Sequence, residues 1–325
     1  PSTDPIVEHD VVRLLDPLNP YSWLKVVQRV RLERPDLVIL PWWTSFWTVP
    51  FFSILSLIRR ETSAKILFIC HNVKEHESTL FHQICTTLVL KLGDFYYVHS
   101  KEDQSNLKKI IPESSTVIRG FHPTYESLQR RKYSRDEARK ELCVTGNVIL
   151  FFGFIRPYKG LKHLLNAMPA IIKGAGPNII CMIVGECWKD EAQYHKQIED
   201  LGIEKHILRV NQYVPNEQVG LYFSAADLVV MPYISATGSG ILQIAFGCGK
   251  PVVATRVGGM ADDIIDGKTG YLVAPADPAG LSSAIVKFFN EKRSDLFEKN
   301  IKIMEDRFSW ERMVDLITTQ VEKTL

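Results

Sequence analysis

The chain has 325 residues, enough for about two domains. Hydrophobic residues make up 46% and charged residues 23%, which is typical of globular proteins and excludes a disordered, collagen-like or coiled-coil chain. The formal net charge of +2 gives no general electrostatic reason to expect nucleic acid as a partner. Six cysteines without a CxxC pair predict buried thiols in a cytosolic protein, rather than a disulfide framework or a zinc site. No uncharged apolar run reaches the ~20 residues of a membrane span.

Short apolar runs alternate with amphipathic runs along the whole chain. Strands are expected, in chain order, at residues 11–15, 36–40, 65–70, 95–99, 116–118, 148–152, 179–184, 207–210, 228–231, 252–254 and 271–273. Helices are expected at residues 21–33, 47–60, 79–92, 101–110, 160–173, 189–202, 216–225, 239–247, 278–291 and 310–324. Most of the strands are continuously apolar, which indicates parallel sheets covered by helices on both faces. The alternation predicts a doubly wound α/β architecture.

The composition changes between residues 126 and 146, where the segment SLQRRKYSRDEARKEL is highly charged and contains no expected strand. We place a domain boundary there, with residues 1–135 in the first α/β domain and residues 136–309 in the second. Neither a strand nor a Gly-rich turn precedes Val11. We therefore expect the first domain to be truncated at its N-terminus.

A loop after the expected strand at 148–152 carries two cations, Arg156 and Lys159. Gly153 ends the strand, and Gly160 opens the next helix. Ligands of open α/β sheets bind at the carboxyl ends of strands, where a helix N-terminus favours phosphate. A guanidinium adds a bidentate fork and an ammonium adds a point charge. The loop is a candidate phosphate site; the alternative is a solvated basic loop with a glycine turn.

A second loop of this kind follows the strand at 228–231, within PYISATGSGILQIAFGCG. Gly238 and Gly240 let a ligand approach the backbone closely, and Thr237 and Ser239 are hydroxyl residues suited to a helix N-cap. A plain capped helix is the alternative for this segment alone. Two such loops in one domain favour a ligand with two phosphates.

These loops and three further segments resemble the retaining family-4 glycosyltransferases of the GT-B fold, also called glycosyl transferases group 1. The further segments are VNQYVPNEQVGLYFSAADLVVMPY, GKPVVATRVGGMADDIIDGKTGYLV and the terminal Phe308-Ser309-Trp310. The resemblance implies two Rossmann-like domains whose parallel sheets face each other across a cleft, with the acceptor on the first domain and the donor on the second. It also implies that residues 310–325 form a helix that crosses back onto the first domain.

The implied reaction moves a sugar from a nucleoside diphosphate, of the UDP or GDP type, to an acceptor with retention at the anomeric carbon. It needs no bound metal and no cofactor. The resemblance implies that Arg156, Lys159 and the amides near Gly238 and Gly240 hold the donor diphosphate. The family's phosphate arginine often follows the glycine of the first loop directly, whereas this chain has Phe154 there and Arg156 two positions later.

The resemblance also assigns residues to the rest of the donor. The loop Asn211-Gln212-Tyr213 lies where similar enzymes place the nucleobase. Aligned on GKPVVAT, the two glutamates of the family fall on Ser235 and Gln243. An amide at Gln243 still suits the ribose hydroxyls, whereas Ser235 leaves only a short hydroxyl near the donor sugar. The predicted donor-binding residues are Gly153, Arg156, Lys159, Asn211, Gln212, Tyr213, Ser235, Thr237, Gly238, Ser239, Gly240 and Gln243.

In the first domain, the segment Cys70-His71-Asn72 ends a strand and is followed by VKEHE. Position and resemblance together predict that His71 contacts the donor sugar or the acceptor; the alternative is a structural histidine that caps the next helix. We expect His71, Arg156 and Lys159 to be the catalytic residues. His76 and Glu77 are further acceptor candidates, with a solvated helix start as the alternative. The spacing of HNVKEHE fits no standard zinc motif, so we expect no metal.

The aromatic run PWWTSFW, followed by VPFFSILSLIRR, has two interpretations. A buried crossover helix is favoured over an interfacial surface for a lipid-linked acceptor. The expected partners are a nucleotide sugar and a glycan or lipid-linked acceptor, with peripheral membrane association and no nucleic acid. We expect a cytoplasmic protein, at the inner face of the membrane, in polysaccharide biosynthesis. Alternatives are a non-catalytic nucleotide-sugar-binding or partner subunit and an epimerase, although epimerases need cleft carboxylates that this sequence lacks.

Overall fold

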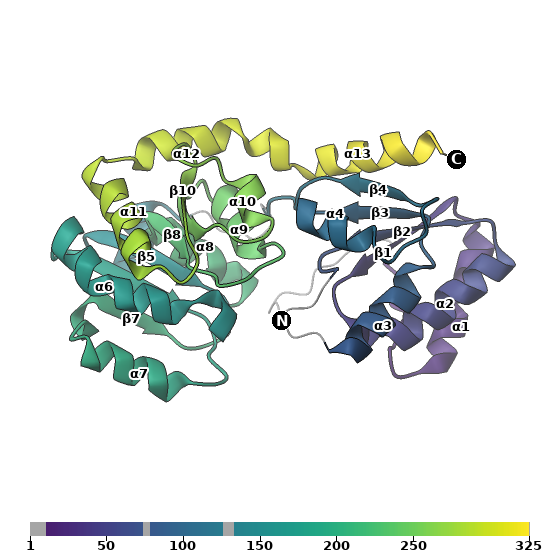
Figure 1. Cartoon of the computed structure of the whole chain (residues 1–325), viewed down its shortest axis with the longest axis horizontal. Helices are drawn as coiled ribbons and strands as arrows, with labels where there is room; N and C mark the ends of the chain where they lie inside the picture. Colours follow the sequence, from purple (N-terminus) through teal and green to yellow (C-terminus); the bar gives the residue numbers. More distant parts are fainter. Residues whose placement is uncertain (1–10, 74–78, 126–132, 325) are drawn as a thin grey trace. The chain divides into compact units, whose positions relative to one another are not determined.

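The computed structural model describes residues 11–73, 79–125 and 133–324. The chain forms two compact units, each built on one parallel sheet (Figure 1). The N-terminal unit comprises the described residues up to Phe121 together with those from Met313 onward, and the C-terminal unit comprises His122–Arg312. The two parallel sheets confirm the α/β architecture that the alternating pattern predicts.

The N-terminal unit contains a four-stranded sheet in the order β1-β2-β3-β4. The strands are β1 (Leu37–Trp42), β2 (Lys65–Cys70), β3 (Phe95–Val98) and β4 (Thr116–Arg119). The helices are α1 (Pro20–Glu33), η1 (Ser45–Trp47), α2 (Thr48–Glu61), α3 (Leu80–Leu90) and α4 (Lys101–Leu107). The last helix, α13 (Trp310–Glu322), belongs to this unit from Met313 onward and buries Met313, Ile317 and Val321.

The aromatic segment after β1 forms a crossover helix that is buried along one side. In α2, Phe51, Leu55 and Ile58 lie in the core of the N-terminal unit, together with Phe68 of β2. The opposite side is open, since Val49 is 63% exposed. The favoured prediction of a buried crossover helix is therefore confirmed for one face of α2.

The C-terminal unit contains a six-stranded sheet in the order β10-β9-β8-β5-β6-β7. The strands are β5 (Asn147–Phe152), β6 (Ile179–Val184), β7 (Ile207–Val210), β8 (Leu228–Met231), β9 (Val252–Thr255) and β10 (Gly270–Val273). The helices are α5 (Arg135–Glu141), η3 (Pro157–Lys159), α6 (Leu161–Ala175), α7 (Glu191–Asp200), η4 (Glu204–His206), α8 (Asn216–Ala225), α9 (Gly240–Gly247), α10 (Met260–Asp263), α11 (Pro278–Asn290), α12 (Ser294–Ile303) and η5 (Glu305–Phe308). This is a Rossmann order: the chain adds β6 and β7 on one side of β5, and then β8, β9 and β10 on the other side. Ligands of such sheets bind at the switch point, which here lies between β5 and β8.

Alternate residues of β5 point to opposite faces of the sheet, as in any strand. Ile149 and Phe151 join the core that includes residues of α6 and α11. On the other face, the ring of Phe152 lies 5.0 Å from that of Phe223 in α8. Helices thus cover both faces, which explains why the strands are apolar throughout.

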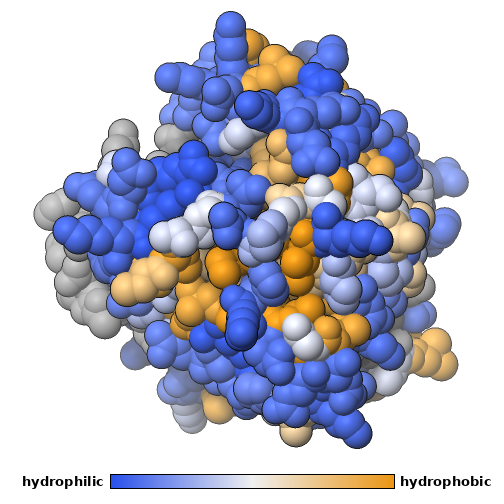
Figure 2. All heavy atoms as spheres, turned by 90° about the vertical axis from the view of Figure 1, so that its left-hand side faces the viewer, coloured by the Kyte–Doolittle hydropathy of each residue, from blue (hydrophilic) through white to orange (hydrophobic). Residues whose placement is uncertain are grey.

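The outer face turned toward the viewer in Figure 2 is mostly hydrophilic, with apolar side chains gathered in a few patches.

Three sequence-based expectations are wrong. Residues 11–15 form no strand, because no neighbouring strand pairs with them in the sheet order. The charged segment, for which no helix is expected, contains α5, which begins with a capping box formed by Ser134 and Glu137. This helix docks through Arg139, whose Nη2 lies 2.7 Å from Oδ2 of the buried Asp227. Cys143 is exposed, since it occupies a turn after α5, and Cys248 is only half-buried, whereas Cys70, Cys85, Cys181 and Cys187 are buried as predicted.

Candidate functional site

The first predicted phosphate loop lies at the carboxyl end of β5, beside the switch point of the C-terminal sheet. The Lys159 ammonium turns inward over Gly153: a Cβ atom at Gly153 would lie only 2.8 Å from Lys159 Nζ. The same nitrogen lies 5.6 Å from the centroid of the Tyr233 ring. Lys159 is 8% exposed, and burial, together with the nearby charge of Arg156, lowers the pKa of its ammonium to about 8.

The second predicted loop joins β8 to the N-terminus of α9. Ser239 occupies the N-cap position of α9, and its hydroxyl makes no capping hydrogen bond to the amides of the first turn. A Cβ atom at Gly238 would meet no atom within 4 Å, so the backbone there is open to a ligand. Thr237 is buried, and the Ser239 hydroxyl lies 3.5 Å from the hydroxyl of Tyr233.

The two loops are joined to each other through their backbones. The amide of Ile234 donates to the carbonyl of Tyr158 at 2.7 Å. Gly160 has φ +72, and a Cβ atom there would lie 1.9 Å from the carbonyl oxygen of Pro232. Only glycine permits both this left-handed conformation and this close approach. The structure therefore brings the two predicted loops together at one end of the sheet.

This geometry suits an anion. Lys159 forms no ion pair with any described residue, and a buried charge without a partner is costly. Ile241, in the first turn of α9, lies close to Gly153: a Cβ atom at Gly153 would be 3.2 Å from its Cδ1. The ammonium and the helix N-terminus therefore border the same space. Positive charge and free amides together are the usual components of a phosphate site.

Several other residues predicted to bind the donor are less buried than Lys159. Arg156 is half-buried, and its guanidinium lies 4.2 Å from the ring centroid of Trp188. Asn211 is exposed, but its Oδ1 accepts a hydrogen bond from the amide of Cys187 at 2.8 Å. Gln212, Tyr213 and Ser235 are exposed at the ends of their strands. Sequence reasoning missed Trp188 and Tyr233, the aromatic neighbours of the two cations; the available signal was an aromatic residue in the loop after an apolar strand.

Gln243 lies inside the unit, with 1% of its surface exposed. Its Nε2 donates to Oδ2 of Asp263 at 2.9 Å, while its Oε1 is buried without a hydrogen-bond partner among the described residues. Burial raises the pKa of Asp263 to about 7, although the charge of Arg307 opposes this shift. The hydrogen bond that Gln243 donates to Asp263 favours the carboxylate, but burial of Asp263 outweighs it.

This pair gives a pH-dependent stability prediction. The folded protein holds the Asp263 proton up to pH about 7, whereas an ordinary aspartate releases it near 3.8, so stability should fall as pH rises through this window. Asp263→Asn removes the titration and offers an amide donor to Gln243. At pH 8 we expect the variant to gain on the order of 1–2 kcal/mol over the wild type, with little gain at pH 4. Urea unfolding across this pH range measures the difference.

The matched control is Asp262→Asn, which changes the exposed neighbour and leaves the Asp263 carboxyl in place. It should retain most of the wild-type pH dependence. A constant difference between Asp263→Asn and the wild type at every pH would contradict a titrating Asp263.

In the N-terminal unit, two histidines meet at the carboxyl ends of β2 and β3. The rings of His71 and His99 stack with centroids 5.1 Å apart, and the Trp43 ring contacts His71 edge-on at 6.4 Å. His99 is buried, and its Nδ1 lies 3.0 Å from the carbonyl oxygen of Phe121. His71 is therefore held between two aromatic rings at the edge of the sheet. His76 and Glu77 lie outside the described residues.

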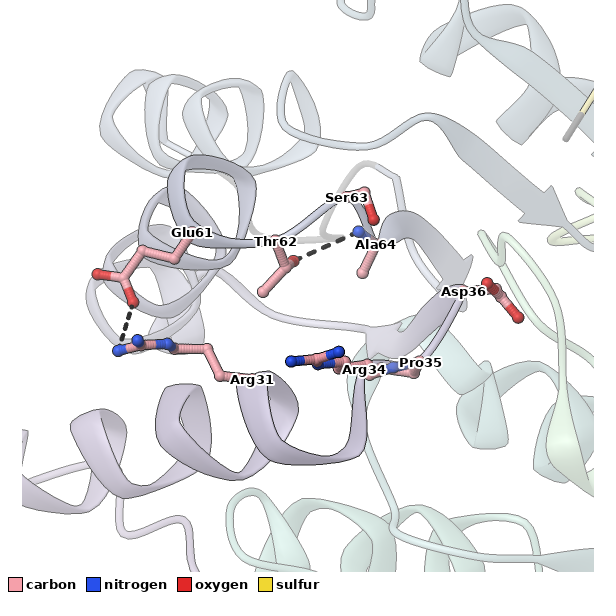
Figure 3. A pocket seen from close by; sticks show the side chains of 8 residues that line it. All are labelled: Arg31, Arg34, Pro35, Asp36, Glu61, Thr62, Ser63 and Ala64. Carbon is pink, nitrogen blue, oxygen red and sulfur yellow. Dashed lines mark hydrogen bonds and ion pairs between the residues drawn. The ribbon is translucent and has the colours of Figure 1, made fainter.

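A separate pocket lies at the opposite edge of the N-terminal sheet, where β1 and β2 begin (Figure 3). Its volume is about 400 Å³. Arg31 and Glu61 form an ion pair at 3.3 Å on one side, and the amide of Ala64 donates to the Thr62 hydroxyl on the other (Figure 3). Since ligands of parallel sheets bind at the carboxyl ends of the strands, this pocket is not part of the candidate site.

Within the part of the chain that the structure describes, no helix is both long and apolar enough to cross a membrane. The same residues contain no group of three or more His, Cys, Asp or Glu side chains arranged to hold a metal ion.

A Rossmann-ordered sheet with a cation and helix N-terminal amides beside its switch point is typical of α/β proteins that bind ligands at this edge of the sheet. Residues 134–304 match the family described as "Glycosyl transferases group 1". The chain belongs to this family, which confirms the predicted resemblance to glycosyl transferases group 1. Its fold, with two Rossmann-like parallel sheets, is that of the GT-B glycosyltransferases, as predicted.

Curated relatives share the family but are longer. A D-inositol 3-phosphate glycosyltransferase of Corynebacterium glutamicum is 29% identical over 243 residues, covering 70% of this chain and 57% of the relative. A GDP-mannose-dependent alpha-(1-6)-phosphatidylinositol monomannoside mannosyltransferase of Mycolicibacterium smegmatis is 28% identical over 170 residues, covering 50% of this chain and 42% of the relative. The chain spans just over half the length of the first of these relatives.

Solved structures share the fold across both units. Sucrose-phosphate synthase of Thermosynechococcus elongatus has a TM-score of 0.72 at 18% identity, covering 94% of this chain and 78% of that chain. Anabaena Alr3699/HepE in complex with UDP also has a TM-score of 0.72, at 23% identity, covering 94% of this chain and 81% of that chain.

Proposed function

We propose that the chain is a retaining glycosyltransferase that moves a sugar from a nucleoside diphosphate to a glycan or lipid-linked acceptor. The buried Lys159 ammonium, held beside the N-terminus of α9 at the switch point, is the observation that carries this proposal. The UDP complex of Alr3699/HepE and the GDP-mannose dependence of the mycobacterial relative support a nucleotide sugar of the UDP or GDP type. Donor binding is assigned to the C-terminal unit, and acceptor binding to the N-terminal unit.

In the proposed reaction, the bond between the anomeric carbon and the diphosphate oxygen breaks, and negative charge develops on the leaving group. Lys159 and the amides of Gly238–Gly240 stabilise this charge as fixed groups, without a metal ion. The acceptor hydroxyl forms the new bond on the same face, and its proton passes to the leaving phosphate. No side-chain base is required in this scheme. Arg156 acts as a second cation of the site, near enough to influence Lys159.

His71 is the residue of the N-terminal unit proposed to contact the transferred sugar or the acceptor. Its ring is fixed between His99 and Trp43, so an orienting role needs little further ordering. The exposed side chains of Phe46 and Val49 support a lipid-linked acceptor and peripheral attachment at the cytoplasmic face of a membrane, in polysaccharide biosynthesis.

Nucleotide binding is the direct test. UDP, GDP and ADP, with their sugar conjugates, are added to the full chain in a thermal-shift panel. A ligand at 100 times its dissociation constant should stabilise the protein by about 2.7 kcal/mol. We expect the nucleotides of one of the three bases to raise the melting temperature by several degrees, and pyrophosphate to raise it less. A panel in which no nucleotide shifts the melting temperature would refute the proposal.

A second function, a non-catalytic nucleotide-sugar-binding or partner subunit, is favoured by one observation. The two positions aligned with the family's glutamates, Ser235 and Gln243, provide no carboxylate, and the Gln243 amide donates inward to Asp263. Nucleotide release in the presence of acceptors separates the two functions. Binding of a sugar nucleotide without any turnover across a panel of acceptors would support the subunit.

A further inference from the structure

The segment at the start of the C-terminal unit, residues 122–125, packs against helix α9. Its backbone is fixed to the same unit, because the amide of Thr124 donates to the carbonyl of Phe308 at 3.0 Å and the Thr124 side chain is buried. A Cβ atom at Gly240, the first residue of α9, would lie 3.5 Å from the ring carbon Cε2 of Tyr125 and 3.8 Å from its hydroxyl oxygen. The Tyr125 ring therefore lies against the first turn of α9.

This turn also borders the candidate phosphate site. Ile241 follows Gly240 and approaches Gly153, the residue over which the Lys159 ammonium is held. The Tyr125 hydroxyl, the start of α9 and the Lys159 ammonium thus lie along one end of the sheet. No function has been assigned above to Tyr125, although it is a polar group beside the helix terminus proposed to bind the diphosphate.

The local hydrogen bonds leave the Tyr125 oxygen as an acceptor. Nδ1 of His122 lies 2.9 Å from the carbonyl oxygen of Pro123, and a carbonyl only accepts, so Nδ1 carries the hydrogen. Burial lowers the pKa of His122, so the imidazole is neutral at neutral pH and its Nε2 accepts. Nε2 lies 3.2 Å from the Tyr125 hydroxyl, which therefore donates to it. No residue in the described part of the chain donates to the Tyr125 oxygen, which can accept a hydrogen bond from a ligand.

The ligand group that fits this acceptor is a sugar hydroxyl. Ionised phosphate oxygens only accept hydrogen bonds, whereas a sugar hydroxyl can donate one. The base is assigned to the loop at 211–213 after β7, and α9 follows β8, which lies on the other side of β5 in the sheet. A diphosphate at Lys159 lies between them, so the transferred sugar falls on the β8 side, with Tyr125. Ser235, aligned with a family glutamate, has no carboxylate to accept from that sugar.

We propose that Tyr125 accepts a hydrogen bond from a hydroxyl of the transferred sugar, with His122 as the positioning residue that orients the phenol. This inference rests on the proposed nucleotide-sugar function and adds a substrate contact to it. The ring centroids of Tyr125 and His122 lie 5.2 Å apart, so the phenol is held in place before the donor binds, which lowers the entropic cost of the contact. One hydrogen bond between uncharged groups changes affinity roughly 3- to 10-fold.

The test compares Tyr125→Phe with the wild type in the full chain by calorimetric titration with UDP, UDP-glucose, GDP and GDP-mannose. Phenylalanine keeps the ring against α9 and removes the hydroxyl, so the melting temperature should change little. We expect the variant to bind the preferred sugar nucleotide roughly 3- to 10-fold more weakly, and the nucleoside diphosphate of the same base within about twofold of the wild type. These two ligands differ only in the transferred sugar, so the split assigns the lost contact to it.

Tyr271→Phe is the matched control. Tyr271 is also a half-buried tyrosine of the C-terminal unit, but it lies in β10, at the far edge of the sheet from the candidate site. This variant should bind both ligands like the wild type.

Two double-mutant cycles test the contact and the role of His122. Deoxy analogues of the preferred sugar nucleotide are titrated first: the analogue without the contacted hydroxyl should bind Tyr125→Phe and the wild type equally, and a loss shared by every analogue contradicts a single contact. His122→Phe should also weaken the sugar nucleotide and not the nucleoside diphosphate. Because His122 acts through Tyr125, combining His122→Phe with Tyr125→Phe should cost no further affinity. Additive losses would remove the positioning role.

The remaining outcomes overturn the inference separately from the proposed function. Unchanged sugar-nucleotide affinity in Tyr125→Phe removes the contact and leaves the function intact. Equal losses for the sugar nucleotide and its nucleoside diphosphate place Tyr125 at the phosphates or the ribose instead. A wild type that binds UDP or GDP but neither sugar nucleotide has no sugar contact, so the inference fails alone. Absence of any nucleotide binding by the wild type refutes the inference and the proposed function together.

Discussion

Replacing Lys159 by methionine should lower kcat/KM for the sugar-nucleotide donor by about two to three orders of magnitude. The ammonium is held over Gly153 beside the N-terminus of α9, where the leaving diphosphate would gain charge. Loss of one fixed donor to a developing anion typically costs this much. The methionine retains the apolar stem and removes a buried charge, so the melting temperature should stay the same or rise. Steady-state kinetics and thermal unfolding of the same preparation measure both effects.

Lys162→Met is the control, because Lys162 is an exposed lysine one turn away in α6. It should keep wild-type kinetics. The pH profile gives a second readout: the pKa of Lys159 is about 8, so donor binding should weaken as pH rises through 8 and the ammonium loses its proton. Lys159→Arg keeps its charge and should not show this loss. Unchanged donor turnover in Lys159→Met would remove Lys159 from the mechanism.

Replacing Gly160 by alanine should lower the free energy of unfolding of the C-terminal unit by about 3 kcal/mol. Two costs add here: φ is +72, and the new Cβ would lie 1.9 Å from the carbonyl oxygen of Pro232. Relief of that clash requires the two candidate phosphate loops to separate. Nucleotide affinity should therefore fall together with stability. Urea unfolding and calorimetric titration measure the two losses.

Gly202→Ala isolates the conformational cost. Gly202 has φ +62, close to that of Gly160, but a Cβ atom there would meet nothing within 4 Å. We expect a loss of about 1 kcal/mol and normal nucleotide binding. If both alanine variants lose the same stability and bind nucleotide equally well, the contact between Gly160 and Pro232 does not hold the loops together.

The sequence predicts most of the sheet because parallel strands buried on both faces are continuously apolar. The run KILFIC, for example, forms β2 over the predicted residues 65–70. The run at 11–15 is apolar too, yet it forms no strand, since an apolar segment becomes a strand only where another strand pairs with it. Helix α5 was missed because its sequence is charged and has few apolar residues. What holds it on the unit is the pairing of Arg139 with Asp227, which lies 88 residues later in the chain.

The sequence by itself determined the α/β class, the two candidate phosphate loops and the presence of Lys159 in one of them. These features depend on local patterns of apolar, glycine and cationic residues. Only the tertiary structure decided which way each side chain turns. Lys159 points inward over Gly153, Arg156 stacks on Trp188, and Gln243 donates to Asp263. The contacts of Arg156 and Gln243 join separate segments of the chain, and close packing of the folded sheet and helices selects all three arrangements.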